Sequence, residues 1–209
     1  MSRITFYFIR HGESKGNKEG LFRGRTDFPL TELGKKQAQS LARALKGIRF
    51  SAIISSPLKR AYETALFVAN GQVVRIMDEF NNINLAEWEG KRKEYIQKKY
   101  PREWHLWITE PEKLQIAGAE TLDEVKERAK RGVLNLIKEY RDGTFCIVTH
   151  RAVLKPLFAE LLGIKKPYFW RLHFDTASYS IIEYDDKRGF TLMKLNVTHH
   201  LPEFEVERF

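Results

Sequence analysis

The sequence predicts an α/β protein: a three-layer α/β/α sandwich around a mostly parallel central sheet, formed by a single domain over residues 1–209. Short apolar runs typical of buried strands alternate with longer segments in which apolar residues recur at helical spacing. This alternation favours a parallel sheet with helices on both faces. The chain is long enough to bury one sizeable core, and it contains neither internal repeats nor a Gly/Ser-rich linker.

The predicted elements follow one another with short connections. Strands are expected at residues 4–9, 52–56, 73–77 and 145–149, followed by a hairpin of strands at 179–184 and 190–195. Helices are expected at residues 31–45, from about residue 58, at 121–139 and at 153–162. Residues 80–118 interrupt the alternation and contain Trp88, Trp104 and Trp107, so we expect an inserted cap or lid there.

The composition predicts a cytoplasmic protein without a membrane partner. No apolar run approaches the roughly 20 residues that span a bilayer, and the N-terminus leads into a strand pattern rather than a signal peptide. Cys146 is the only cysteine, so the chain forms no internal disulfide, which suits a reducing compartment. Its apolar neighbours predict that Cys146 is a small core residue.

The formal net charge of +9 comes largely from residues 91–102. Such a segment can attract nucleic acid, guide an anionic small molecule, or form the exposed face of an amphipathic helix. Tyr95, Ile96 and Tyr100 lie at helical spacing among the charges, which favours the helix. We therefore expect no nucleic-acid partner.

Four residues with useful chemistry follow predicted core strands. Arg10 and His11 follow the first strand, Arg60 follows the second, and His150 follows the strand at residues 145–149. Ligands of open parallel sheets bind outside the carboxyl ends of the strands, so we expect these side chains to meet in one crevice. Grouped cations require an anion, and a neutral imidazole can attack phosphorus while guanidinium groups hold the phosphoryl oxygens.

Five motifs, in order, resemble signatures of the histidine phosphatase superfamily, the phosphoglycerate-mutase-like group. The resemblance runs from about residue 4 to residue 184. The motifs are Arg10-His11-Gly12-Glu13-Ser14, Leu30-Thr31-Glu32-Leu33-Gly34, Ser55-Ser56-Pro57-Leu58-Lys59-Arg60-Ala61-Tyr62-Glu63-Thr64-Ala65, Trp88-Glu89-Gly90 and Thr149-His150.

The resemblance implies that His11 is a nucleophile that forms a phosphohistidine, which water then hydrolyses. Arg23 occupies a position near the phosphate where glutamine is more common. The resemblance implies no metal or cofactor, because guanidinium groups supply the positive charge. The other residues that it assigns to the phosphate are Arg10, Asn17, Arg60 and His150.

The chain departs from the family at the proton donor. Alignment back from Trp88-Glu89-Gly90 places Asn82 where a glutamate commonly protonates the leaving alcohol. An asparagine amide cannot do so, and general acid catalysis contributes on the order of 10²–10⁴-fold. Three explanations remain open: a carboxylate such as Glu87 or Glu79 substitutes, the substrate has a good leaving group, or activity is low.

Two further departures concern the substrate. Arg151 stands where glycine usually follows the second histidine, and it either binds a second acidic group or points to solvent. Residues 91–118 contain no Arg-Arg pair of the kind with which mutases of the family hold phosphoglycerate. Instead, Gly118-Ala119-Glu120-Thr121 resembles the Gly-Gly-Glu-Ser of the phosphatase branch.

The sequence thus predicts a metal-independent phosphomonoesterase that hydrolyses a small phosphorylated metabolite through phospho-His11. The catalytic residues would be His11, Arg10, Arg60, His150 and Glu87, and the substrate-binding residues Asn17, Arg23, Asn82 and Arg151. One alternative is a cofactor-dependent phosphoglycerate mutase. The other is a phospholigand-binding protein with little turnover, because Asn82 replaces the acid. The sequence leaves the oligomeric state open.

Overall fold

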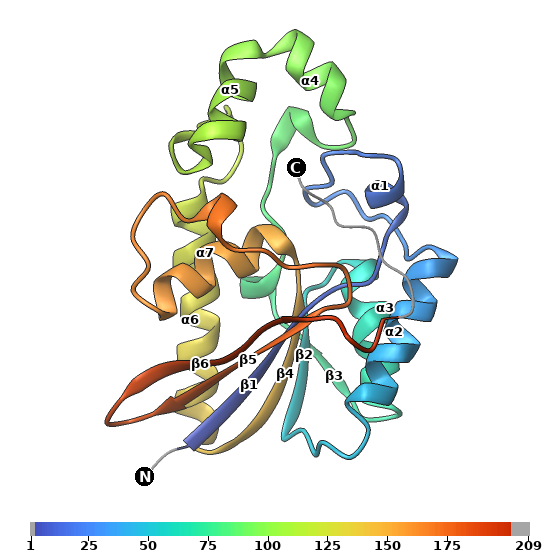
Figure 1. The fold of residues 1–209 in the computed structure, drawn as a ribbon, viewed down its shortest axis with the longest axis vertical. Helices are drawn as coiled ribbons and strands as arrows, with labels where there is room; N and C mark the ends of the chain where they lie inside the picture. Colours follow the sequence, from blue (N-terminus) through green and yellow to red (C-terminus); the bar gives the residue numbers. More distant parts are fainter. Residues whose placement is uncertain (1–2, 202–209) are drawn as a thin grey trace.

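The computed structural model describes residues 3–201, and its centre is a six-stranded sheet (Figure 1). The strand order is β3-β2-β4-β1-β5-β6. The first four of these strands are parallel to one another, β5 pairs antiparallel with β1, and β6 pairs antiparallel with β5, which confirms the mostly parallel α/β sheet. The strands are β1 (Arg3–Arg10), β2 (Ala52–Ser55), β3 (Val74–Ile76), β4 (Gly143–Thr149), β5 (Tyr179–Asp185) and β6 (Gly189–Val197).

Helices cover both faces of the sheet (Figure 1). On one face lie α2 (Glu32–Ala44) and α3 (Lys59–Ala69), and on the other α6 (Leu122–Tyr140) and α7 (Arg151–Leu161). Short helical segments complete the chain: α1 (Lys15–Lys18), η1 (Asp78–Phe80), η2 (Ala86–Trp88), η3 (Pro111–Lys113) and η4 (Phe169–Arg171). Across residues 3–201, none of the helices combines the length and apolar character that crossing a bilayer requires.

The alternation of side chains along each strand divides the core into two layers. In β1, Phe6 and Phe8 pack in the cluster that includes α6 and α7, whereas Ile9 packs with α2 and α3. Successive residues of a strand point to opposite faces, so a strand buried on both sides is apolar almost throughout. Cys146 of β4 is fully buried in the α2/α3 layer, as the sequence predicted.

The register of the central strands brings the predicted catalytic residues to one edge of the sheet. Arg10 pairs with Thr149 at the end of the parallel β1–β4 ladder. His11 and His150 are the next residues of the two strands, so both lie at the carboxyl ends of β1 and β4. The chain leaves β1 toward helices on one face and leaves β4 toward α7 on the other. The two strands therefore diverge at a topological switch point, where open α/β sheets bind ligands.

A close approach between two backbones fixes the turn after β1. A Cβ atom on Gly12 would lie 2.6 Å from the carbonyl oxygen of Gly34, and one on Gly34 would lie 2.0 Å from that of Glu13. Thr31 caps α2 by accepting a hydrogen bond from the Gly34 N–H at 3.0 Å. The Leu30–Gly34 motif thus has a structural role: it lets the start of α2 press against the His11 turn.

The segment predicted as a cap, residues 80–118, contains two short α-helices, α4 (Lys93–Lys99) and α5 (Pro101–Thr109), which lie beyond the end of the sheet (Figure 1). We refer to these two helices as the cap. The sequence predicted one helix over residues 91–102, but Pro101 ends the first helix and begins the second. Proline has no N–H to donate and disfavours helical geometry in the preceding residue. The Phe22 ring lies 4.9 Å from Trp88 and 5.4 Å from Trp107, centroid to centroid, which joins the cap to the body.

We expect Gly34→Ala to destabilise the protein by at least about 2 kcal/mol, because its methyl group would overlap the Glu13 carbonyl and α2 would have to shift. Urea unfolding measures the loss. Gln39→Ala, at an exposed position of the same helix, is the control and should change the unfolding free energy by less than about 0.5 kcal/mol. Equal stability of the two variants would show that the contact is not tight.

Candidate active site

A cavity of about 520 Å³, counting its open mouth, lies between the carboxyl ends of the central strands and the cap. Its lining contains six residues that the sequence singled out: Arg10, His11, Arg23, Asn82, His150 and Arg151. The cap and α7 side add Lys93, Trp107 and Phe169. Within the described residues, no carboxylate lines this cavity.

His11 is buried at the floor of the cavity, with 2% of its surface exposed. Its Nδ1 lies 2.6 Å from the Gly12 carbonyl oxygen, which can only accept, so Nδ1 bears the proton. The lone pair is therefore on Nε2. Burial, followed by the charges of Arg60 and Arg10, lowers the pKa of His11 well below its ordinary value. The imidazole is thus held neutral and nucleophilic.

His150 lies beside His11, with a distance of 5.1 Å between the ring centroids. Its Nε2 is 2.7 Å from the hydroxyl oxygen of Ser56, while its buried Nδ1 has no hydrogen-bond partner. Burial, followed by the charge of Arg60, lowers the pKa of His150 as well. When Ser56 donates to Nε2, His150 carries its proton on Nδ1 and can donate it to a ligand oxygen.

Arg60 is fully buried directly behind the cavity wall, so it contacts the wall rather than lining it. Its Nη1 donates to the Thr26 carbonyl and its Nη2 to the Gly24 carbonyl, both at 2.8 Å, and its Nε has no partner. Burial, then repulsion by Arg23, lowers the pKa of Arg60 to about 9. Carbonyl oxygens position this guanidinium without neutralising it, so a nearby anion would stabilise its charge.

Arg10 is the other fully buried arginine of the site. Its Nη1 donates to the Phe174 carbonyl at 2.8 Å, and its side chain lines the cavity beside His11.

Gly24, whose carbonyl binds Arg60, has a φ of +45°, and a Cβ there would lie 2.3 Å from the Glu89 carboxylate. Only glycine fits this position, because the backbone bends around the guanidinium.

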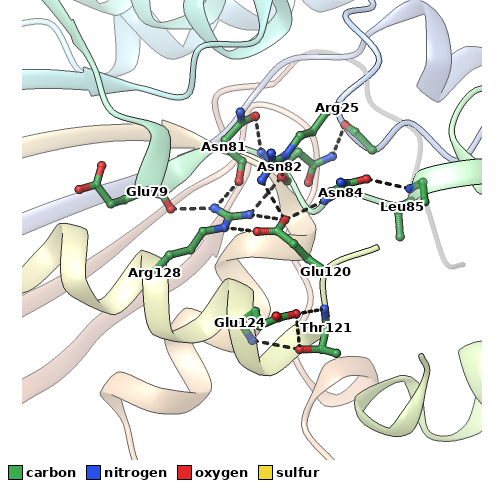
Figure 2. Close-up of polar contacts among 12 residues, drawn as sticks. Arg25, Glu79, Asn81, Asn82, Asn84, Leu85, Glu120, Thr121, Glu124 and Arg128 are labelled. Carbon is green, nitrogen blue, oxygen red and sulfur yellow. Dashed lines mark hydrogen bonds and ion pairs between the residues drawn. The ribbon is translucent and has the colours of Figure 1, made fainter. Parts of the chain in front are cut away.

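The backbone that supports Asn82 is held by Arg128 of α6 (Figure 2). Arg128 Nη1 donates to the carbonyls of Glu79 at 2.8 Å and Asn81 at 2.7 Å, and Nη2 donates to that of Asn82 at 3.0 Å. Glu120 accepts from Arg128 Nε at 2.8 Å and pairs with Arg25 Nη2 at 3.1 Å. Burial opposes ionisation of Glu120, but the bonds from Arg128 and Asn84 outweigh it and lower its pKa.

The carboxylates that were predicted to replace the missing acid lie away from the cavity. Glu87 is exposed, accepts a hydrogen bond from the Tyr100 hydroxyl at 2.7 Å, and does not belong to the lining of the cavity that contains His11. Glu79 contacts Arg128 through its carbonyl, and its carboxylate points away from Asn82 (Figure 2). We therefore do not assign the proton donor to either residue.

Two of three predicted substrate-binding residues line the cavity, and the third does not. Arg23 and Arg151 line the cavity, and Arg151 is buried rather than directed to solvent. Asn17 does not line it: its Oδ1 accepts from the Ser14 N–H at 3.1 Å and from the Ser14 hydroxyl at 2.6 Å, which caps α1. Contact between Asn17 and phosphate stays a prediction.

Several residues that position the site from a distance could not be recognised from the sequence. Ser56 and Glu120 were visible within motifs, but nothing in the sequence linked Ser56 to His150 or Glu120 to the Asn82 segment. Arg25 and Arg128 gave no signal, because they bind backbone carbonyls that lie far away along the chain. Within residues 3–201, histidine, cysteine, aspartate and glutamate form no group able to hold a metal ion.

Comparison with known proteins agrees with this geometry. The sequence profile described as "Histidine phosphatase superfamily (branch 1)" matches residues 6–198. Phosphoserine phosphatase 1 of Hydrogenobacter thermophilus is 36% identical over 98% of this chain and 97% of its own. The adenosylcobalamin/alpha-ribazole phosphatase of Escherichia coli is 29% identical over 92% and 96%. The structure of Bacillus stearothermophilus YhfR is 31% identical, with a TM-score of 0.89 over 95% of this chain and 99% of its own.

The buried neutral histidines make stability depend on pH. Each has a pKa near 6.5 when unfolded and a lower one when folded, so the unfolded state takes up more protons and stability falls as pH drops below 6.5. Between pH 6.5 and 5.5 each histidine should account for about 1 kcal/mol of this loss. Urea unfolding in phosphate-free buffer should therefore show His11→Asn losing about 1 kcal/mol less than the wild type. Equal losses would mean that His11 is not buried in its neutral form.

Removal of the Arg128 side chain should weaken both the fold and the site. Arg128→Ala leaves three carbonyls without their donor and Glu120 without its main partner, so we expect a loss of about 3 kcal/mol in unfolding free energy and a lower kcat/KM. Arg131→Ala, at an exposed position of the same helix, is the matched control. If the Arg128→Ala protein were as stable and as active as the control, the Arg128 network would contribute to neither stability nor activity.

Proposed function

The chain belongs to the histidine phosphatase superfamily and is a phosphoric monoester hydrolase, and we propose that it acts through a phosphohistidine on His11. One observation carries this assignment. The Nδ1–H of a buried, neutral His11 is bound to the Gly12 carbonyl, so the Nε2 lone pair is available beside buried arginines. A nucleophile of this kind needs no deprotonation step before it attacks phosphorus.

In the first step, Nε2 of His11 attacks the phosphorus atom and the bond to the leaving oxygen breaks. Charge spreads over the three remaining phosphoryl oxygens, and Arg10, Arg60 and the Nδ1–H of His150 stabilise it. Their stabilisation is electrostatic and is already in place before the reaction, because backbone carbonyls and Ser56 hold these groups in position. Water then attacks the phosphohistidine and releases phosphate.

The proposed substrate is a small phosphate ester with a second anionic group. Arg23, Lys93 and Arg151 add positive charge to the cavity beyond the phosphate-binding groups. One turn along α7 from Arg151, the Lys155 Nζ lies 4.5 Å from the ring centroid of Phe169, which itself lines the cavity. The relatives named for phosphoserine and alpha-ribazole show that similar chains act on small phosphate esters.

Neither alternative function is favoured. The relatives described above are named as phosphatases rather than mutases. A pure binding protein would not need the Nε2 lone pair of His11 to be available, whereas a nucleophile does. Asn82 lowers the expected rate for poor leaving groups, but it leaves the nucleophile and the phosphate-binding cations unchanged.

The test is a hydrolysis assay in EDTA over phosphoserine, alpha-ribazole phosphate, 3-phosphoglycerate and aryl phosphates. We expect release of inorganic phosphate that EDTA does not reduce, and a loss of at least about 10³-fold in kcat for His11→Ala. Lys36→Ala, at an exposed position of α2, is the control for handling of the protein.

Two results would contradict the proposal. Hydrolysis that survives His11→Ala would exclude the phosphohistidine route. Isomerisation of 3-phosphoglycerate in the presence of a bisphosphoglycerate primer, without stoichiometric phosphate release, would favour the mutase.

A further inference from the structure

The orientation of the Asn82 side chain is fixed by its neighbours. Its Nδ2 donates to the Gly24 carbonyl at 2.8 Å, and that same carbonyl accepts from Arg60 Nη2 at 2.8 Å. Because a carbonyl oxygen can only accept, the amide nitrogen must face Gly24 and the amide oxygen must face the other way.

The backbone below this amide is equally constrained. The Asn82 carbonyl accepts from Arg128 Nη2 at 3.0 Å and from Arg25 Nε at 3.2 Å, and Glu120 pairs with both of these arginines (Figure 2). The Asn82 N–H donates to Asn81 Oδ1 at 2.8 Å. The backbone that carries the amide is thus held in place, and rotating the side-chain amide by 180° would set Oδ1 against the Gly24 carbonyl, where two acceptors would repel.

The consequence is a buried acceptor at the cavity. Asn82 lines the cavity with 7% of its surface exposed, and its Oδ1 has no hydrogen-bond partner. A buried acceptor without a donor destabilises the empty site, and a ligand that supplies a donor would remove that cost. A phosphate ester dianion presents only acceptors, so its oxygens would repel Oδ1. A monoanion presents one P–OH group, which can donate.

We propose that Asn82 Oδ1 accepts a hydrogen bond from the protonated phosphoryl oxygen of the substrate, so that the enzyme takes phosphate monoester monoanions and uses the substrate's own proton in place of a general acid. This inference rests on the proposed function of His11. It also explains how a site without a carboxylic acid in its described lining can expel an alcohol.

The reaction balances without another acid. As His11 Nε2 forms its bond to phosphorus, the P–O bond to the leaving group breaks and the P–OH proton passes to that leaving oxygen. The products are a neutral alcohol and an imidazolium, still protonated on Nδ1, that bears a phosphoryl dianion. Water then adds to phosphorus as the P–N bond breaks, which returns neutral His11 and gives dihydrogen phosphate.

None of the protein groups described below is expected to change its protonation state near pH 6, so a pH dependence there would come from the substrate. Lowered pKa values keep His11 and His150 neutral there, and Glu120, with its lowered pKa, is ionised. The Glu89 carboxylate is bound to the N–H groups of Arg25 and Leu85, and Lys93 adds a cation from α4. Arginine stays cationic throughout; those that line the cavity or contact its wall are Arg10, Arg23, Arg25, Arg60, Arg128 and Arg151.

The test is the pH dependence of kcat/KM for a series of alkyl and aryl phosphates. Alkyl phosphates have a second pKa of about 6, and electron-withdrawing aryl groups lower it. We expect kcat/KM to fall about tenfold per pH unit above the second pKa of each substrate, so the break point moves with the substrate. A break point at one pH for all substrates, or a level profile between pH 5 and 8, would overturn the inference.

Binding of inorganic phosphate gives an independent readout. For the wild type, the inhibition constant should rise about tenfold per pH unit above the second pKa of phosphate. For Asn82→Leu, which keeps the approximate shape but lacks both the Oδ1 acceptor and the Nδ2 donor to Gly24, this rise should disappear. The same rise in both proteins would contradict a role for Oδ1. Hydrolysis that survives His11→Ala would refute the proposed function, whereas His11-dependent hydrolysis with a fixed break point would refute only this inference.

Discussion

The site depends on guanidinium groups that the protein positions with backbone carbonyls. Arg60 donates to two carbonyls and, in the described part of the chain, forms no ion pair within 4 Å. A carboxylate in those places would neutralise the charge, whereas a carbonyl fixes the geometry and leaves the charge available to an anion. The cost is the burial of like charges near one another. Burial, and after it the same charges, lowers the pKa of His11 and keeps it neutral. The arginines that we propose bind phosphate thus also help to keep the proposed nucleophile neutral.

Much of this arrangement could be predicted from the sequence, because it follows from strand ends. The carboxyl ends of neighbouring parallel strands meet at one edge, so a residue type that follows each strand marks the site. Arg10 and Thr149 pair in register, which puts His11 beside His150 as expected. The strands themselves were predictable because apolar residues on both faces produce uninterrupted apolar runs.

The remainder depends on contacts between distant segments and on side-chain direction. Glu87 lies close to Asn82 in sequence, but the η2 turn leaves it exposed to solvent beside Tyr100. The cap was predicted as an insertion, yet its division into α4 and α5 depends on Pro101. The orientation of the Asn82 amide depends on Gly24, Arg128 and Arg25, and no local pattern connects those positions.

The stereochemical course at phosphorus tests the central claim, covalent transfer through His11, most directly. A substrate made chiral at phosphorus with oxygen isotopes is hydrolysed, and the configuration of the released phosphate group is determined. Two successive in-line displacements, first by His11 and then by water, predict net retention of configuration. Net inversion would mean that water attacks the substrate directly, and it would contradict the account.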